Sequence, residues 1–352
     1  MASKDRCGNA TCIKSADLGS LPKCSRCRKV AYCSRECQLA VWPTHKQFCV
    51  RPNYIIKFHL APEDISEPPV TRTLSCPAHA AFYMLHMALQ TAFGWATTHS
   101  FDFAVKDPEF RPYDSLAEYI NLRMSISTTN ERLPASASRE FLFRVVDPAK
   151  HTAFSGVDRM HEGIRRHPNT PEVKADNYKL FQLFDDTQFQ NLEIVYTYDF
   201  GDKWEHSLTI IGREDATRNF VCLDGSGHYV AEDVGGVRGW ESLKEAYRVA
   251  SPTREQKERR AWFEGQASNF DPRGLAGDRV NTWDREMINR ALESGTMFER
   301  FEMMAYRHYD NAVSGREINP IVNKADQAEM LISKVGARVS LPHILESNAQ
   351  SP

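Results

Sequence analysis

Seven cysteines and one histidine lie within the first fifty residues of this 352-residue chain, at spacings typical of metal ligands. The last six of them comprise a CxxC pair and two pairs whose members are four residues apart, so each of these two pairs can point in one direction from a helix. The full set is Cys7, Cys12, Cys24, Cys27, Cys33, Cys37, His45 and Cys49, and only Cys76 and Cys222 follow in the rest of the chain. Such a cluster could form disulfides or bind zinc.

The surrounding sequence favours zinc. The residues before Cys7, MASKDR, are polar and charged rather than an apolar secretory segment, which indicates a reducing, intracellular location in the cytoplasm or nucleus. Eight nitrogen and sulfur donors complete two tetrahedral sites, so no coordination position is left for water or substrate, and the zinc ions are expected to be structural. Fifty residues bury too little core to fold alone, whereas each structural zinc contributes roughly 10–16 kcal/mol.

The cysteine pattern, together with Tyr32-Cys33-Ser34, Cys37-Gln38 and Trp42-Pro43-Thr44-His45-Lys46, resembles the MYND zinc finger over residues 7–49. The first pair departs from the family's more usual spacing, since four residues separate Cys7 from Cys12 where the family more often has two. The resemblance implies two cross-braced structural Zn²⁺ sites. One would use Cys7, Cys12, Cys33 and Cys37, and the other would use Cys24, Cys27, His45 and Cys49.

The resemblance also implies a partner. MYND fingers bind short proline-containing peptides of other proteins beside the last helix, through a Gln and a Trp. These positions correspond to Gln38 and Trp42, which are four residues apart and therefore share a helix face. The alternative for Trp42 is a place in the small core of the finger.

Charge argues against nucleic acid as the main partner. Residues 1–50 contain nine basic and three acidic residues, and seven thiolates with two Zn²⁺ ions would reduce their formal charge from +6 to +3. We expect the remaining patch, made of Arg26, Arg28, Lys29 and Arg35, to balance the anionic zinc–thiolate sites. The rest of the chain carries 35 basic and 43 acidic residues, which disfavours a nucleic-acid-binding surface there. A DNA-associated transcriptional regulator is the weaker alternative.

The remaining chain must supply a larger domain. It has no run of 18 apolar residues, so we expect no membrane span. Alternation of apolar and polar residues predicts strands at 54–60 and 101–105 and a hairpin over 192–210 whose turn contains Gly201-Asp202. Between them, Ser75 is predicted to cap a helix that ends at Gly94 and carries His86 as a core histidine. Further helices are expected at 254–263 and 283–292.

The hairpin sequence YTYDFGDKWEHSLTI is distinctive, and so are LQTAFGW at 89–95, EDVGGVRGW at 232–240 and FDPRGLAGDRVN at 270–281. Together these segments resemble the plasmid pRiA4b ORF-3-like family. The resemblance implies an α+β domain over 53–292, with an antiparallel sheet and packed helices, and it leaves 107–190 divergent, partly an insertion around 147–177. Residues 293–352 are expected to be a partly disordered C-terminal extension. One departure concerns Cys222, because Tyr229 occupies the place of the family's second cysteine.

Ionisable residues near two glycine-bearing turns could form a second site, for acid–base chemistry or a cation. Turn geometry explains most of them structurally, since Asp202 suits a turn and His206 shares a strand face with Leu208. The SET-type Asn-His-Ser-Cys signature, a GxGxxG turn, a Walker A loop and an HExxH helix are all missing. The sequence therefore favours a zinc-binding adaptor over an enzyme. The alternative is an enzyme or small-ligand-binding protein that uses Asp199, Asp202, His206, Glu232 and Asp233.

Overall fold

The computed structural model describes most of the chain up to residue 294. The described residues are 6–12, 21–112, 115, 117–118, 120–122, 124, 137–148, 161–163 and 165–294. The extension expected at 293–352 therefore lies almost entirely outside them. Within the described residues, no helix is long and apolar enough to cross a membrane.

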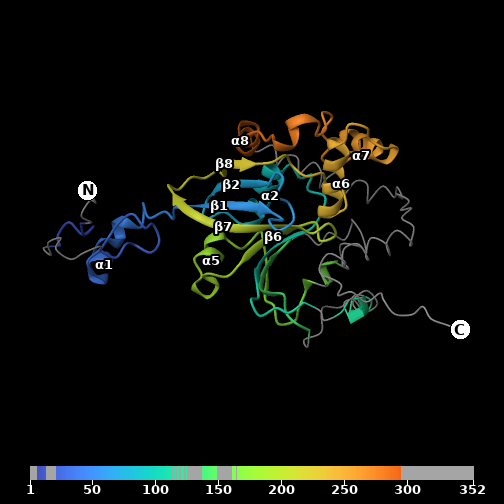
Figure 1. Cartoon of the computed structure of the whole chain (residues 1–352). Coiled ribbons are helices and arrows are strands. Elements are labelled where there is room, and N and C mark those ends of the chain that lie inside the picture. Colours follow the sequence, from blue (N-terminus) through green and yellow to red (C-terminus); the bar gives the residue numbers. More distant parts are fainter. Residues whose placement is uncertain are drawn as a thin grey trace, which may run out of the picture.

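A finger segment comes first, followed by a body built on one sheet (Figure 1). The finger carries α1 (Arg35–His45). The strands are β1 (Asn53–Leu60), β2 (Thr71–Cys76), β3 (Phe101–Lys106), β4 (Phe141–Val146), β5 (Glu172–Lys174), β6 (Ile194–Tyr198), β7 (Trp204–Glu214) and β8 (Val221–Ser226). The body helices are α2 (Phe82–Phe93), α5 (Leu180–Phe184), α6 (Gly236–Arg248), α7 (Arg254–Gly265) and α8 (Arg285–Glu293), with 3-10 turns η1 (Thr187–Phe189) and η2 (Gly277–Asn281).

The eight strands form one sheet in the order β5-β4-β3-β6-β7-β1-β2-β8. Neighbours are antiparallel, as the sequence predicts, except that β4 and β5 run parallel. In β1, the side chains of Tyr54, Ile56, Phe58 and Leu60 are all fully buried, whereas Lys57 is exposed. The period-2 pattern therefore identifies the core face correctly, because successive strand residues point to opposite sides of the sheet.

Helix α2 covers this core face and ends at Gly94, whose φ of 70° is left-handed. The predicted start of the helix is wrong. Ser75 lies in β2 and is fully buried, and Ala81 precedes the helix without a side-chain cap. All six residues of β2 are buried, so this strand shows no alternation by which it could be recognised. His86 is a core histidine as predicted, since its Nδ1 lies 2.8 Å from the Tyr196 hydroxyl.

On the opposite face of the sheet, buried charged side chains pair with one another at β3 and β4. Asp102 of β3 is fully buried and accepts hydrogen bonds from Arg144 of β4, at 2.8 Å, and from two nitrogens of Arg165, at 2.8 and 3.1 Å. Burial opposes ionisation of Asp102, but Arg165 and Arg144 hold its pKa below the ordinary value. Part of the region around 147–177 that the sequence leaves unplaced therefore packs against the sheet, and it also supplies β5.

Arg72 of β2 joins α2 to the far edge of the sheet. Its side chain is 2% exposed and donates to the carbonyl of Ala92 at 2.8 Å, and to those of Thr71 and Ser226 at 2.6 Å each. A fourth bond reaches the carbonyl of Gly227 at 3.1 Å. The guanidinium thus donates hydrogen bonds to backbone carbonyl groups that are buried away from water.

The edge strand β8 is covered by α8. Asn289 accepts a hydrogen bond from the backbone N–H of Cys222, at 2.7 Å, and donates to its carbonyl, at 2.9 Å. The side-chain amide thereby takes the place of a neighbouring strand and protects the edge from pairing with another chain.

Replacing Arg72 with methionine tests the buried anchor. R72M should lower the free energy of unfolding by about 3 kcal/mol, because the carbonyl groups stay buried without donors. Urea unfolding followed by tryptophan fluorescence measures the change. The matched control is R254M, since the Arg254 side chain is 93% exposed, and it should change stability by no more than about 0.5 kcal/mol. Equal effects of the two substitutions would contradict the assignment.

Candidate functional site

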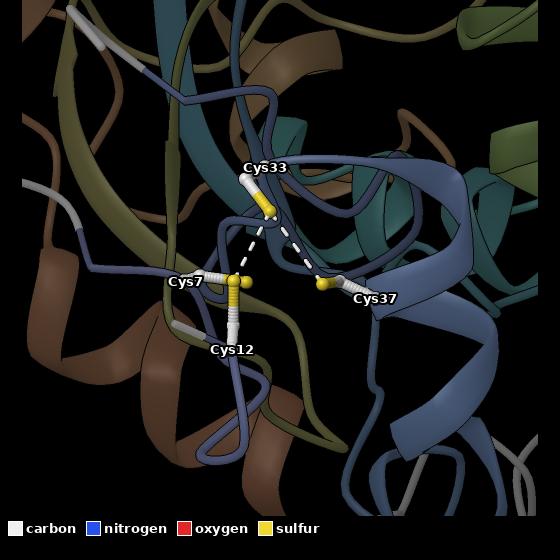
Figure 2. A group of neighbouring side chains, drawn as sticks. All are labelled: Cys7, Cys12, Cys33 and Cys37. Carbon is white, nitrogen blue, oxygen red and sulfur yellow. Dashed lines mark hydrogen bonds between the residues drawn. The ribbon is translucent and has the colours of Figure 1, made fainter. Parts of the chain in front are cut away.

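The first cysteine cluster brings together Cys7, Cys12, Cys33 and Cys37, whose sulfurs all lie within 4.8 Å of one another. Figure 2 shows these sulfurs pointing into one space, with dashed lines from the Cys33 sulfur to those of Cys12 and Cys37. The Cys33 sulfur is 3.4 Å from that of Cys12 and 3.5 Å from that of Cys37. The unusual spacing of the first pair therefore does not prevent convergence.

The second cluster contains Cys24, Cys27, His45 and Cys49, again with ligand atoms within 4.8 Å of one another. The Cys24 and Cys49 sulfurs are 3.7 Å apart, and the Cys27 sulfur is 3.6 Å from Nε2 of His45. A tetrahedron of sulfurs about 2.3 Å from zinc has edges of about 3.8 Å, so both clusters fit the metal. The two ligand sets interleave along the chain, which is the cross-braced arrangement that the resemblance implies.

Local structure fixes these ligands. Cys7 and Lys23 each form a backbone bridge with Ala31. Ser34 caps α1 by accepting a hydrogen bond from the Cys37 N–H at 3.3 Å. The cap therefore fixes the first turn of the helix, which carries the metal ligand Cys37. Side-chain amides contact the sulfurs from outside: Asn9 lies 3.6 Å from Cys37, and Gln38 lies 3.8 Å from Cys24. Such contacts orient metal ligands and tune their charge.

Thiols packed this closely cannot all ionise without a cation. Burial raises the pKa of Cys24, but hydrogen bonds from the Cys27 backbone and from His45 outweigh it and lower the pKa to about 6. Burial and the neighbouring Cys24 together raise the pKa of Cys49 to about 12. A divalent ion would remove this conflict by stabilising several thiolates at once, which is how zinc binding becomes folding free energy. None of the nine cysteines is paired in a disulfide.

The predicted peptide-binding residues lie beside the second cluster. Gln38 and Trp42 are both half-buried on α1. Gln38 contacts the Cys24 sulfur, and the Trp42 ring lies 5.8 Å from the ring of His45. Both side chains therefore touch ligands of the same metal.

A second group of charged residues meets in the body. His99 lies before β3, Asp199 follows β6, and Asp233 precedes α6, yet their ligand atoms lie within 4.8 Å of one another. Nε2 of His99 is 2.9 Å from Asp233 Oδ1 and 3.7 Å from Asp199 Oδ2. Burial opposes protonation of His99, but the two carboxylates outweigh burial and raise the pKa of the histidine to about 9.

Glu232 ties the loops of this group together. It is fully buried and accepts hydrogen bonds from Tyr198 Oη, Thr98 Oγ1 and the Ala96 N–H, each at 2.5 Å. Asn269 connects the same loops: its side chain accepts a hydrogen bond from the Glu232 N–H and donates to the carbonyls of residues 94 and 230. The segments that carry the sequence resemblance thus meet at one place: the end of 89–95, the hairpin turn, the start of 232–240 and the approach to 270–281.

Besides Glu232, the side chains of two other predicted residues, Asp202 and His206, are not part of this group. Asp202 accepts from the Gly235 N–H at 3.0 Å, so it caps the turn before α6. His206 is fully buried among aromatic rings, 4.5 Å from Phe93, and its Nδ1 lies 3.0 Å from the Trp204 carbonyl. The histidine that does join the acids, His99, was missed, because it lies in a loop without periodicity.

The first prediction from these sites concerns zinc. Replacing Cys27 with serine should reduce bound zinc from two equivalents to about one and expose the finger to trypsin at Arg28 and Lys29, because the metal replaces a core there. Elemental analysis and limited proteolysis measure both effects, while the thermal melting of the body should not change. Cys222→Ser, which alters a buried cysteine outside the clusters, is the control and should keep both equivalents. Undiminished zinc in C27S would overturn the ligand assignment.

The second prediction concerns pH. Burial lowers the pKa of His206 to about 3, so between about pH 6.5 and 3 the unfolded chain binds a proton that the folded chain does not. Stability is therefore lost as the pH falls through this window. Between pH 7.5 and 5.5 the wild type should lose about 1.4 kcal/mol more than H206F, because phenylalanine cannot titrate. Urea titrations of both proteins measure this difference, and parallel pH profiles would contradict it.

Comparison with known proteins covers both parts of the chain. The sequence model of the "MYND finger" matches residues 5–49, and that of "Plasmid pRiA4b ORF-3-like protein" matches residues 54–278. An uncharacterised protein of Sinorhizobium fredii, y4hQ, is 26% identical over 232 residues, which are 63% of this chain and 91% of that protein. A protein of unknown function from Methanosarcina mazei aligns structurally with 19% identity and a TM-score of 0.42, over 66% of this chain and 96% of that one.

The finger has its own relatives. The Drosophila melanogaster zinc finger MYND domain-containing protein 10 homolog is 50% identical over 42 residues, which are 12% of this chain and only 8% of that protein. The residues at the amino terminus therefore form a MYND finger, a zinc-dependent module of protein interaction with two structural zinc ions. Since the body model matches well over half of the chain, the protein belongs to the plasmid pRiA4b ORF-3-like family, with a MYND finger preceding the family's domain.

Proposed function

We propose that this protein is an adaptor whose finger, residues 7–49, binds a short proline-containing peptide of a partner protein through Gln38 and Trp42. The body, taken as residues 53–292, then binds a second ligand, and 293–352 form an extension. The observation that carries the proposal is that both recognition side chains rest on ligands of one metal cluster, Cys24 and His45. Zinc thus holds them in place before a partner arrives, which reduces the entropy lost on binding.

The donor and acceptor chemistry suits a peptide backbone. The amide nitrogen of Gln38 contacts the Cys24 sulfur, so its carbonyl oxygen is the atom offered to an N–H of the partner. The indole of Trp42, four residues along the same helix, offers a flat apolar surface. Proline-containing segments adopt an extended helix without internal hydrogen bonds and dock on aromatic surfaces, which matches this pair.

Exposed apolar side chains extend the surface of the finger. Leu39 is 58% exposed, Phe48 is 81% exposed and Val50 is 49% exposed. These exposed apolar side chains add to the area of the small module that a partner could cover.

Charge favours a protein partner over DNA. Two of the four basic residues in the finger's patch pair with carboxylates of the protein's own body: Lys29 lies 2.6 Å from Asp215, and Arg28 lies 3.9 Å from Asp185. These contacts reduce the positive charge that the finger offers to a phosphate backbone. DNA association is therefore the weaker candidate.

A comparison of the wild type with the double variant Q38A/W42A on an array of immobilised proline-containing peptides tests the proposal. The double variant should lose at least about tenfold in affinity for every peptide that the wild type captures, since buried aromatic anchors dominate such contacts. It should keep two zinc equivalents, which shows that the finger is folded. The matched control is Q47A, because Gln47 is exposed and lies beyond the helix. Equal capture by the wild type and the double variant would show that Gln38 and Trp42 do not bind the peptide.

A further inference from the structure

We propose that His99, Asp199 and Asp233 form a third metal site, in the body, for a divalent first-row transition-metal ion such as Mn²⁺. The ligand atoms come from three segments that are far apart in sequence. This site is independent of the finger and of its proposed peptide, and it gives the body a ligand of defined chemistry.

The separations of the ligand atoms fit coordination. Metal–ligand bonds of about 2.1 Å place neighbouring ligand atoms about 3.0 Å apart in an octahedron and about 3.4 Å apart in a tetrahedron. Nε2 of His99 is 2.9 Å from Asp233 Oδ1 and 3.7 Å from Asp199 Oδ2, and the ligand atoms of all three residues lie within 4.8 Å of one another. One imidazole with two carboxylates is a ligand set that suits Mn²⁺, Fe²⁺ or Zn²⁺ better than a soft thiophilic ion.

In each carboxylate, one oxygen accepts hydrogen bonds from neighbouring residues and the other oxygen faces His99. Asp199 Oδ1 accepts from the N–H groups of Gly201, at 2.8 Å, and Asp202, at 3.1 Å, whereas its Oδ2 faces the histidine. Asp233 Oδ2 accepts from Ser268 at 3.1 Å, whereas its Oδ1 faces the histidine. Hydrogen-bonding partners that hold one oxygen and orient the other are the outer shell that metal-binding carboxylates have in proteins.

Charge also favours a cation. Asp199 is 4% exposed and Glu232 is fully buried, and the three hydrogen bonds that Glu232 accepts come from uncharged donors. Glu232 acts on His99 electrostatically, as Asp199 and Asp233 do. The carboxyl groups of Asp199, Asp233 and Glu232 thus act on one imidazole, whose single positive charge can balance only one carboxylate. A divalent ion balances their negative charge more completely.

The site is open on one side. The Asp199 side chain is 5% exposed, but those of His99 and Asp233 are 20% and 46% exposed. Three protein ligands with an accessible side leave coordination positions for water or for an oxygen donor from solution. This arrangement is typical of metal sites that bind ligands, in contrast to the closed sites of the finger.

Binding of Mn²⁺ to the full-length, zinc-loaded protein tests the proposal, because Mn²⁺ prefers oxygen and nitrogen ligands and does not compete for the thiolates. Electron paramagnetic resonance of free Mn²⁺ should show one equivalent bound by the wild type. D233N should weaken binding by at least about tenfold. Asp233 is half exposed and has a φ of 62°, which asparagine tolerates, so this variant should remain folded. H99A should lose binding as well.

The matched control is D202N. It removes a carboxylate three residues from Asp199, but its amide oxygen can still accept the hydrogen bond from Gly235. D202N should bind Mn²⁺ as the wild type does, and all variants should retain two zinc equivalents, which separates this site from the finger. Absence of Mn²⁺ binding by the wild type, or equal losses in D202N and D233N, would show that the three residues form only an ion pair.

Discussion

Metal coordination is the constraint on which the finger depends. Helix α1 has eleven residues, and none of them is buried. A helix of this length is marginal in water by itself. Its partly buried Cys37, Val41 and Trp42 pack only against the small cluster of Cys24, Cys27, Tyr32 and Cys49. What fixes it is that Cys37 belongs to one cluster and His45 to the other, so the two metals hold both ends. Whatever the helix presents to a partner therefore depends on zinc.

The body depends on a different constraint, the need to satisfy polar groups inside it. Arg72 pairs carbonyls of β2, α2 and the end of β8, and Asp102 holds Arg144 and Arg165 against the sheet. Glu232 does the same for the loops that carry His99 and Asp233. Each of these groups would be costly to leave unpaired, so each fixes a loop or a strand in one position. The group of charged residues at the hairpin turn is thus supported by the same chemistry that specifies the fold.

The sequence predicted what is encoded locally. Ligand spacing predicted the finger, and alternation predicted β1, β3 and the β6–β7 hairpin, because both patterns need only neighbouring residues. Strand β2 was missed because it is buried on both faces and contains Arg72, a residue that usually marks the surface. The approach of His99 to Asp233 joins residues 134 positions apart, and no local pattern records such a contact. His206 was a candidate for the second site because it follows a turn, although its alternation with Leu208 indicates a position on a strand face.

The two parts of the chain are joined by weaker forces than those that hold each part. Asp185 forms salt bridges with Arg213 at 2.6 Å and with Arg51 of the linker at 3.3 Å. Arg28 of the finger lies 3.9 Å from the same carboxylate. Lys29 and Asp215 pair at 2.6 Å, but their side chains are 59% and 86% exposed. Exposed pairs of this kind contribute about 0–1 kcal/mol each and weaken in salt, far below the free energy of zinc coordination. The ion pairs between the finger and the body are therefore much weaker than the coordination that stabilises the finger itself.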